Sequence, residues 1–148
     1  MAASTVPAAL DALVGGLRTT LPDVQVVDGP PLTTNPDVIC VGFSGVPGEP
    51  AVESTRTREQ LAREPDRESY DIACLASSWS GATDPKPVRD RAYELLDAVA
   101  ARLGADPTLG GAVMSTRVSA ESLIPEQTDQ GAVATVTFTV HVDAFARR

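Results

Sequence analysis

His141 is the only histidine in this sequence of 148 residues, and it limits the chemistry that the chain could perform. A catalytic triad that combines serine or cysteine with histidine would have to use it. A zinc site needs three or four ligands at short spacing, and the sequence has neither a second histidine nor a close pair of cysteines. His141 alternates with threonines in a strand pattern that offers it no partner. We therefore interpret it as a solvent-facing strand residue, and the sequence predicts no metal and no other cofactor.

Cys40 and Cys74 are the other candidates for nucleophilic chemistry. Both lie in apolar runs, where a thiol loses its hydration and stays protonated and unreactive. Two cysteines do not make the disulfide framework of a small secreted domain, so we expect two buried thiols. A small enzyme that uses Cys40 or His141 stays open as an alternative, but the sequence favours a protein without catalytic activity.

The charge and composition exclude several classes of protein. The formal net charge is −8, whereas nucleic-acid binding needs clustered lysines and arginines. Hydrophobic residues make up 43% and charged residues 22%, which predicts a single globular domain over residues 1–148. No stretch approaches the ~20 apolar residues of a membrane span, and the N-terminus lacks the pattern of a secretory signal. We expect a protein that is assembled in the cytoplasm and has no membrane partner.

The first predicted helix begins near Ser4 or Thr5, either of which could cap it. Gly15 and Gly16 lie inside this helix and weaken it by about 1 kcal/mol each, but they also let a neighbouring backbone come close. Apolar residues recur at helical spacing and form one stripe: Leu10, Leu13, Val14 and Leu17.

The second predicted helix is the clearest in the sequence. Thr83 or Asp84 caps it, and Gly104 ends it. A helix of roughly 20 residues is about 30 Å long, which is enough to cross a small sheet. Its apolar stripe consists of Val88, Ala92, Leu95, Leu96, Val99 and Leu103.

Four segments predict strands by their apolar or alternating pattern: residues 24–27, 37–43, 113–123 and 131–144. The last of these alternates apolar with mostly hydroxyl-bearing residues, so its even-numbered residues should pack against the helices. The prediction is an α+β fold, with a mainly antiparallel or mixed sheet of about four to five strands, two helices packed on one face and a protruding hairpin.

Residues 51–71 carry charges of both signs and few large apolar side chains. One interpretation is a solvated loop. The other is an extended hairpin whose arms are residues 51–61 and 70–76, the second arm entering the sheet as a further strand. Such a hairpin would suit contact with another subunit. The residues expected at a subunit interface or facing a lumen are Glu53, Arg56, Arg58, Glu59, Leu61, Arg63, Arg67 and Trp79.

Trp79 follows the second arm of that hairpin and lies between serines. We expect it to be half-buried. A lone tryptophan at a strand end can anchor an interface, because tryptophan is enriched at binding hot spots. Placement in the core is the interpretation that we favour over an interface anchor. Nearby acidic residues, including Glu68 and Asp71, are interpreted as solvated.

Several passages together resemble the tail terminator proteins of long-tailed bacteriophages, small proteins that cap the tail tube and join it to the head. They are residues 68–72, 93–99, 106–111 and 131–140, in this order. The resemblance covers most of the chain, and its specificity comes from order and spacing, since none of these passages is chemically diagnostic. Residues 51–71 offer no strong match.

The resemblance implies a homohexameric ring at the head-proximal end of the tail in the virion. One face of the ring would lie on the major tail protein, which builds the tube, and the other on a head-completion or connector protein. Genomic DNA would pass through the lumen without specific binding. Six copies would carry a charge of about −48, which is six times −8, and an acidic lumen lets DNA slide.

Other functions are compatible with the same residues. A head-tail connector or stopper is also a ring-forming virion protein and is the nearest alternative. A monomeric ligand-binding module would need an apolar pocket, which an aromatic content of 4% disfavours.

Overall fold

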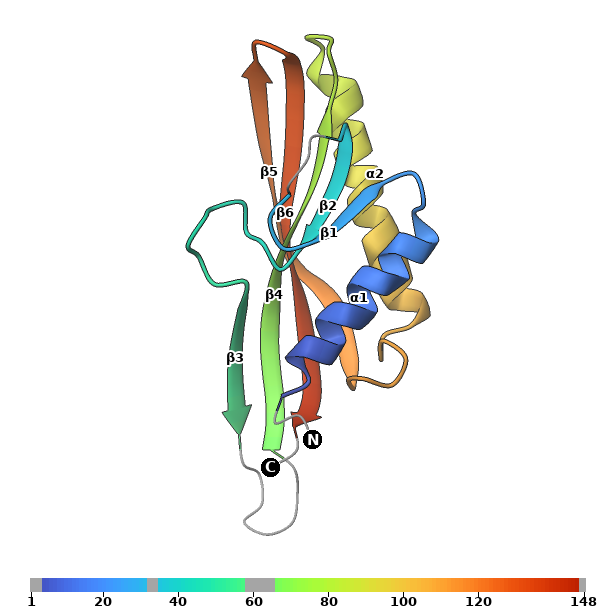
Figure 1. Cartoon of the computed structure of the whole chain (residues 1–148), viewed down its shortest axis with the longest axis vertical. Helices are drawn as coiled ribbons and strands as arrows, with labels where there is room; N and C mark the ends of the chain where they lie inside the picture. Colours follow the sequence, from blue (N-terminus) through green and yellow to red (C-terminus); the bar gives the residue numbers. More distant parts are fainter. Residues whose placement is uncertain (1–3, 32–34, 58–65, 147–148) are drawn as a thin grey trace.

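The computed structural model describes residues 4–31, 35–57 and 66–146, and within them it contains two helices and six strands (Figure 1). The predicted α+β fold is confirmed, with one strand more than expected because the first arm of the hairpin pairs as a strand of its own. The helices are α1 (Val6–Thr20) and α2 (Pro85–Ala105). The strands are β1 (Gln25–Asp28), β2 (Asp37–Val41), β3 (Val52–Thr57), β4 (Asp66–Trp79), β5 (Ser115–Thr128) and β6 (Gly131–Ala146).

The two longest neighbours, β4 and β6, form the centre of the sheet. They pair antiparallel without a break from Asp66 opposite Ala146 to Trp79 opposite Val133. The strand predicted at residues 131–144 is confirmed and runs two residues further. Its even-numbered residues are buried, as the alternation predicts, since both helices lie on that side of the sheet.

The remaining strands flank this pair, in the order β1-β2-β4-β6-β5. β3 lies beside the first half of β4 and β2 beside its second half, so both occupy the same side of β4. β1 runs parallel to β2 and the other pairs are antiparallel, which makes the sheet mixed. The predicted hairpin of residues 51–71 is confirmed in the pairing of β3 with β4; its turn, residues 58–65, lies outside the described residues.

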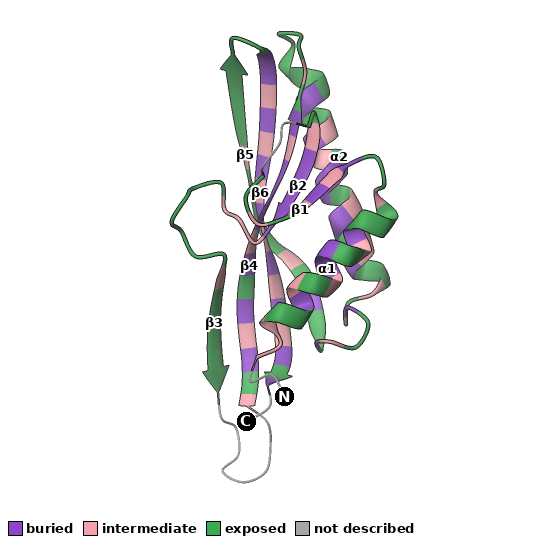
Figure 2. Cartoon of the chain, in the orientation of Figure 1, coloured by how far each residue is buried: buried purple, intermediate pink, exposed green. Residues whose placement is uncertain are grey.

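β5 differs most from its prediction, since it begins at Ser115 and continues to Thr128. Residues 124–128 lie beyond the predicted strand and are all exposed, and no apolar alternation marks them as a strand in the sequence. Thr128 pairs with Gly131 across a tight turn, so β5 continues until it reaches the first residue of β6. Figure 2 shows the contrast between exposed β5 and β3 and the striped burial of β4 and β6.

Both helices cover one face of the sheet (Figure 1). Asp84 caps α2 by accepting a hydrogen bond from the backbone N–H of Lys86 at 3.1 Å, and the helix ends one residue beyond Gly104. All members of the predicted α2 stripe are buried: Val88, Ala92, Leu95, Leu96, Val99 and Leu103. In α1 the residues Leu13, Val14 and Leu17 are buried, whereas Leu10 is only partly buried.

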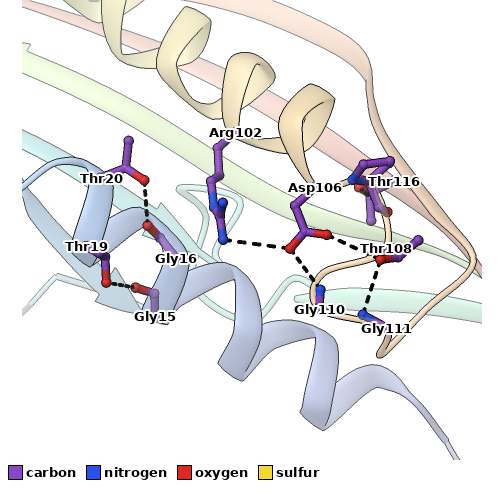
Figure 3. A network of polar contacts seen from close by, with 11 residues as sticks. Gly15, Gly16, Thr19, Thr20, Arg102, Asp106, Thr108, Gly110, Gly111 and Thr116 are labelled. Carbon is purple, nitrogen blue, oxygen red and sulfur yellow. Dashed lines mark hydrogen bonds and ion pairs between the residues drawn. The ribbon is translucent and has the colours of Figure 1, made fainter.

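The close approach predicted at the glycine pair of α1 is made by a side chain. A Cβ on Gly16 would lie 2.8 Å from Nε of Arg102, whereas nothing lies within 4 Å of a Cβ on Gly15. Arg102 also forms an ion pair with Asp106 at 3.8 Å, and Asp106 accepts the backbone N–H of Gly110 at 2.9 Å (Figure 3). This network joins the end of α2 to the loop that leads into β5, and Arg102 packs against α1 at Gly16.

Gly131, at the start of β6, has a backbone conformation that only glycine tolerates. Its φ is +122°, and a Cβ there would lie 2.0 Å from the carbonyl oxygen of Ser80. The next residue, Ala132, exchanges backbone hydrogen bonds with this loop, donating to Ala82 at 2.9 Å and accepting from Ser80 at 3.0 Å. The start of β6 is therefore fixed to the loop that follows β4.

Replacing Gly131 with alanine should lower the free energy of unfolding by about 3 kcal/mol or more, because the Cβ collides with backbone and the φ is strained. Gly15→Ala provides the matched control. It should raise the free energy of unfolding by about 0.5 to 1 kcal/mol, because it removes a flexible residue from a helix where space is open. Urea denaturation followed by circular dichroism measures both, and equal effects would contradict the close approach at Gly131.

Candidate functional site

The predicted interface residues do not gather at one place. Glu53 and Arg56 lie on β3 and Arg67 near the start of β4, whereas Trp79 is the last residue of β4. Arg67 and Trp79 are separated by twelve positions of extended chain, about 40 Å at ~3.3 Å per residue. Arg58, Glu59, Leu61 and Arg63 lie outside the described residues. The structure thus places candidate contacts at the hairpin end of the sheet and, separately, at its opposite end.

At the hairpin end, Glu68 is completely buried, so its interpretation as a solvated acid is wrong. Its carboxylate accepts hydrogen bonds from the hydroxyl of Ser4 at 2.7 Å and from the hydroxyl and backbone N–H of Thr5 at 2.7 and 2.9 Å. Nη2 of Arg56 lies 3.5 Å from the same carboxylate. The alternation of side chains along β4 could have indicated this burial in the sequence. Glu68 lies on the same face as Tyr70 and Ile72, which are also buried.

This contact replaces the helix cap that the sequence predicts. Thr5 is the N-cap residue of α1, but its side chain binds Glu68 and makes no capping hydrogen bond. Burial raises the pKa of Glu68, but the hydrogen bonds from Ser4 and Thr5 and the charge of Arg56 outweigh it, so the pKa lies below its ordinary value. The ionised Glu68 therefore holds the start of α1 on β4, where the helix dipole also favours an anion.

The face of the sheet opposite the helices, which we call the uncovered face, carries a polar cluster on β4 and β6. Nδ1 of His141 lies 2.8 Å from Oδ1 of Asp71, and its Nε2 lies 3.3 Å from Oγ of Ser69 and 3.4 Å from Oδ2 of Asp143. His141 lies on this face, as predicted, but the prediction that it lacks a partner is wrong. Asp143 lies two residues along the same strand, whereas Ser69 and Asp71 come from β4, whose register with β6 the sequence does not reveal.

The contacts of Asp71, His141 and Ser69 follow the order of a catalytic triad, but they lack two of its requirements. The hydroxyl of Ser69 donates to Oδ1 of Asp143 at 3.0 Å, so its proton is directed to a carboxylate and away from the imidazole. All of these residues lie on regular paired strands, whose backbone N–H groups point along the sheet and cannot form an oxyanion hole above it. The arrangement links two strands by hydrogen bonds between their side chains.

Both cysteines are buried and lie on opposite faces of the sheet. Cys40 packs with Val38 and Leu75 on the uncovered face, and burial raises the pKa of its thiol to about 11. Burial likewise raises the pKa of Cys74 to about 12. Neither thiol is ionised near neutral pH, so neither has the activation that a cysteine nucleophile needs.

Trp79 lies on the uncovered face with 40% of its surface exposed, so its placement in the core is wrong and its half-burial is confirmed. It lines a hollow of about 550 Å³ together with Val38, Val133 and Pro31. The turn between β5 and β6 contributes Thr128, Asp129 and Gln130. A concave apolar site therefore exists in spite of the low aromatic content, and its position at the sheet end leaves it accessible to another protein.

Within the residues that the structure describes, no helix is long and apolar enough to cross a membrane. The described side chains also contain no group of three or more histidines, cysteines or acids that is placed to hold a metal ion.

No protein-family model and no curated protein matches the chain. Among solved structures, a chain described as "Virion of native gene transfer agent (GTA) particle" has a similar fold, with a TM-score of 0.51. The sequence identity is 9%, and the alignment covers 93% of this chain and 94% of that chain. At this identity the similarity establishes a shared fold over nearly the whole length of both chains.

Glu68→Gln should lower the free energy of unfolding at pH 7 by about 1.5 to 3 kcal/mol, because it removes the charge from a buried, hydrogen-bonded carboxylate. Because the pKa of Glu68 is lower in the folded state, this stabilisation is complete above the pKa of the unfolded chain, ~4.3, and is lost as the pH falls through the folded value. The wild-type protein and Glu68→Gln should therefore converge in stability in acid.

The exposed Glu121 of β5 is the matched control, and Glu121→Gln should change the free energy of unfolding by no more than about 0.5 kcal/mol. Thermal or urea unfolding at several pH values between 3 and 7 measures both variants. A difference between the wild-type protein and Glu68→Gln that is independent of pH would contradict this role for Glu68.

If the polar cluster is not a triad, the wild-type protein and Ser69→Ala should hydrolyse an activated ester such as p-nitrophenyl acetate at the same background rate. Ser69→Ala removes the hydroxyl that would act as the nucleophile and leaves His141 beside Asp71. A loss of more than tenfold in Ser69→Ala would identify the cluster as catalytic.

Proposed function

We propose that the chain is a structural protein of a phage-like virion, a tail terminator that caps the tail tube as a ring and joins it to the head. The observation that carries the proposal is the similarity of fold, over almost the entire chain, to a chain of a gene transfer agent virion. The passages that resemble tail terminators also support it, since they are spread over most of the chain.

The distribution of burial supports the proposal of a ring subunit. Helices cover one face of the sheet, and the other carries a polar cluster and an apolar hollow. The edge strands β3 and β5 are almost entirely exposed. A subunit with an uncovered face and exposed edges has surface available for several neighbours at once.

The two separated contact regions suit a protein that joins two different structures. The hairpin end carries the charged residues Arg56 and Arg67, whereas the opposite end carries the apolar hollow at Trp79. In the proposed hexameric ring, these ends face different partners, one the major tail protein and the other the head-completion protein. The net charge of −8 per chain favours a lumen through which DNA passes without binding.

The location in the particle tests this function against its nearest alternative. Antibody labelling of heads and tails that have been separated should place the protein on the head-proximal end of tails. A connector or stopper would stay on heads that lack tails, and finding the protein only there would contradict the tail terminator assignment. Negative-stain images and light scattering of the purified protein, alone and with tail tubes, should show a ring.

Trp79→Ala should reduce binding to a neighbouring virion protein by about tenfold or more, because a partly exposed tryptophan in an apolar hollow has the properties of a binding hot spot. Met114→Ala is the matched control, since Met114 is similarly exposed at 47% but does not line this hollow. Sedimentation of each variant with purified tail tubes and with heads measures the binding. Equal binding by the two variants to both particles would show that the hollow is not a contact surface.

A further inference from the structure

The sheet has two unpaired edges at its hairpin half. There the strand order is β3-β4-β6-β5, and within the described residues no strand pairs with the outer side of β3 or of β5. Five of the six residues of β3 are exposed, and so are most residues of β5. Exposed edges of this kind are templates for pairing with another chain.

The directions of these strands define which edges can join. Each of the four strands runs antiparallel to its neighbour, so β3 and β5 also run antiparallel to each other. A second copy that is related by rotation about an axis along the strands would bring its β5 beside β3 of the first copy. The new pair would then be antiparallel and would continue the alternation of the sheet.

The side chains at the two edges are complementary in charge. One row across the sheet reads Glu53, Asp71, His141 and Arg117, with Glu53 at one edge and Arg117 at the other. Both end residues are exposed, and their register places both on the uncovered face. Among the described residues neither forms an ion pair within its own chain.

The two edges also match in apolar surface, in the row next to this one. That row reads Val52, Ile72, Val140 and Val118, on the face that the helices cover. The two central residues are completely buried, whereas Val52 and Val118 at the edges are only partly buried against the core. Joining the edges in this register would bring the two edge valines together and would extend the buried row from one copy into the next.

We propose that β3 of one copy pairs antiparallel with β5 of the next, with Glu53 opposite Arg117 and Val52 opposite Val118. This inference rests on the proposed assembly into a ring and identifies the surfaces that close it. A register shifted to the next position on the same face replaces Arg117 with Ser115 in one direction and, because β5 has an irregularity between Val118 and Ala120, with Ala120 in the other. Neither residue can neutralise Glu53, so charge favours the register with Arg117.

Disulfide cross-linking between copies tests both the edges and the register. Directly opposed residues on antiparallel strands have Cβ atoms ~4.5 to 5.5 Å apart, so the double variant Glu53→Cys/Arg117→Cys should form covalent oligomers on mild oxidation. The native cysteines are buried and do not compete. The matched controls Glu53→Cys/Ser115→Cys and Glu53→Cys/Ala120→Cys should cross-link at least fivefold less, as measured by gel electrophoresis without reductant.

Charge exchange provides a second measurement. Glu53→Arg and Arg117→Glu should each weaken self-association by about 3- to 10-fold, and the double variant that carries both changes should recover it. Light scattering over a range of concentrations measures association, and circular dichroism verifies that each variant is folded. Both sites are exposed, so the fold should tolerate the changes.

Three results would overturn the proposal. One is stronger cross-linking in a shifted register, and another is failure of the charge exchange to restore association. The third is absence of cross-linking in a preparation that light scattering shows to be oligomeric. In that last case the ring function would survive and only its interface would be wrong, whereas a monomer that is also missing from virions would contradict both.

Discussion

The uninterrupted antiparallel pairing of β4 with β6 determines where every other element of this protein can lie. Two long strands in register present two faces, and the alternation of their side chains makes one face apolar. Ile72, Val136, Val140 and Val142 are completely buried on that face, beneath the two helices. Both helices are needed to bury the apolar face of β4 and β6. These two strands are too long for either helix alone to cover when it crosses the sheet at an angle (Figure 1).

The first helix depends on this pair through a polar contact as well as an apolar one. Glu68 brings a buried carboxylate to the N-terminus of α1, where the hydroxyls of Ser4 and Thr5 and one backbone N–H satisfy it. A buried charge without such partners would cost several kcal/mol, so the contact specifies one position of α1 along β4. Arg56 approaches the same carboxylate from β3, which connects the hairpin to the start of the helix.

The sequence predicts those parts of the fold in which one periodic pattern repeats over many residues. The α2 stripe and the alternation in β6 are both of this kind, and both are confirmed. The polar sites are different, because Ser4 and Thr5 lie more than sixty residues from Glu68 in the chain, and Asp71 lies similarly far from His141. Only the register of β4 with β6 and the docking of α1 bring them together. Residues 124–128 show the opposite case, because pairing with β6 makes a strand out of a segment with no apolar alternation.

The same constraint explains why this fold suits an assembly. A sheet that is covered on one face can be stable alone only if its other face and its edges are polar enough to be solvated. Here most of the uncovered face satisfies that condition, through His141, Asp71 and Asp143 at one end and threonines along β6. The apolar exceptions are the buried cluster of Val38, Cys40 and Leu75, the hollow at Trp79 beside it, and the half-buried valines at the edges. The hollow and the edge valines expose apolar surface to water, which is unfavourable. Each lies at a boundary of the sheet, where a neighbouring subunit could cover it without disturbing the core. The folded chain is thus stable in its interior and leaves apolar surface at its margins, where the proposed contacts with neighbouring proteins would cover it.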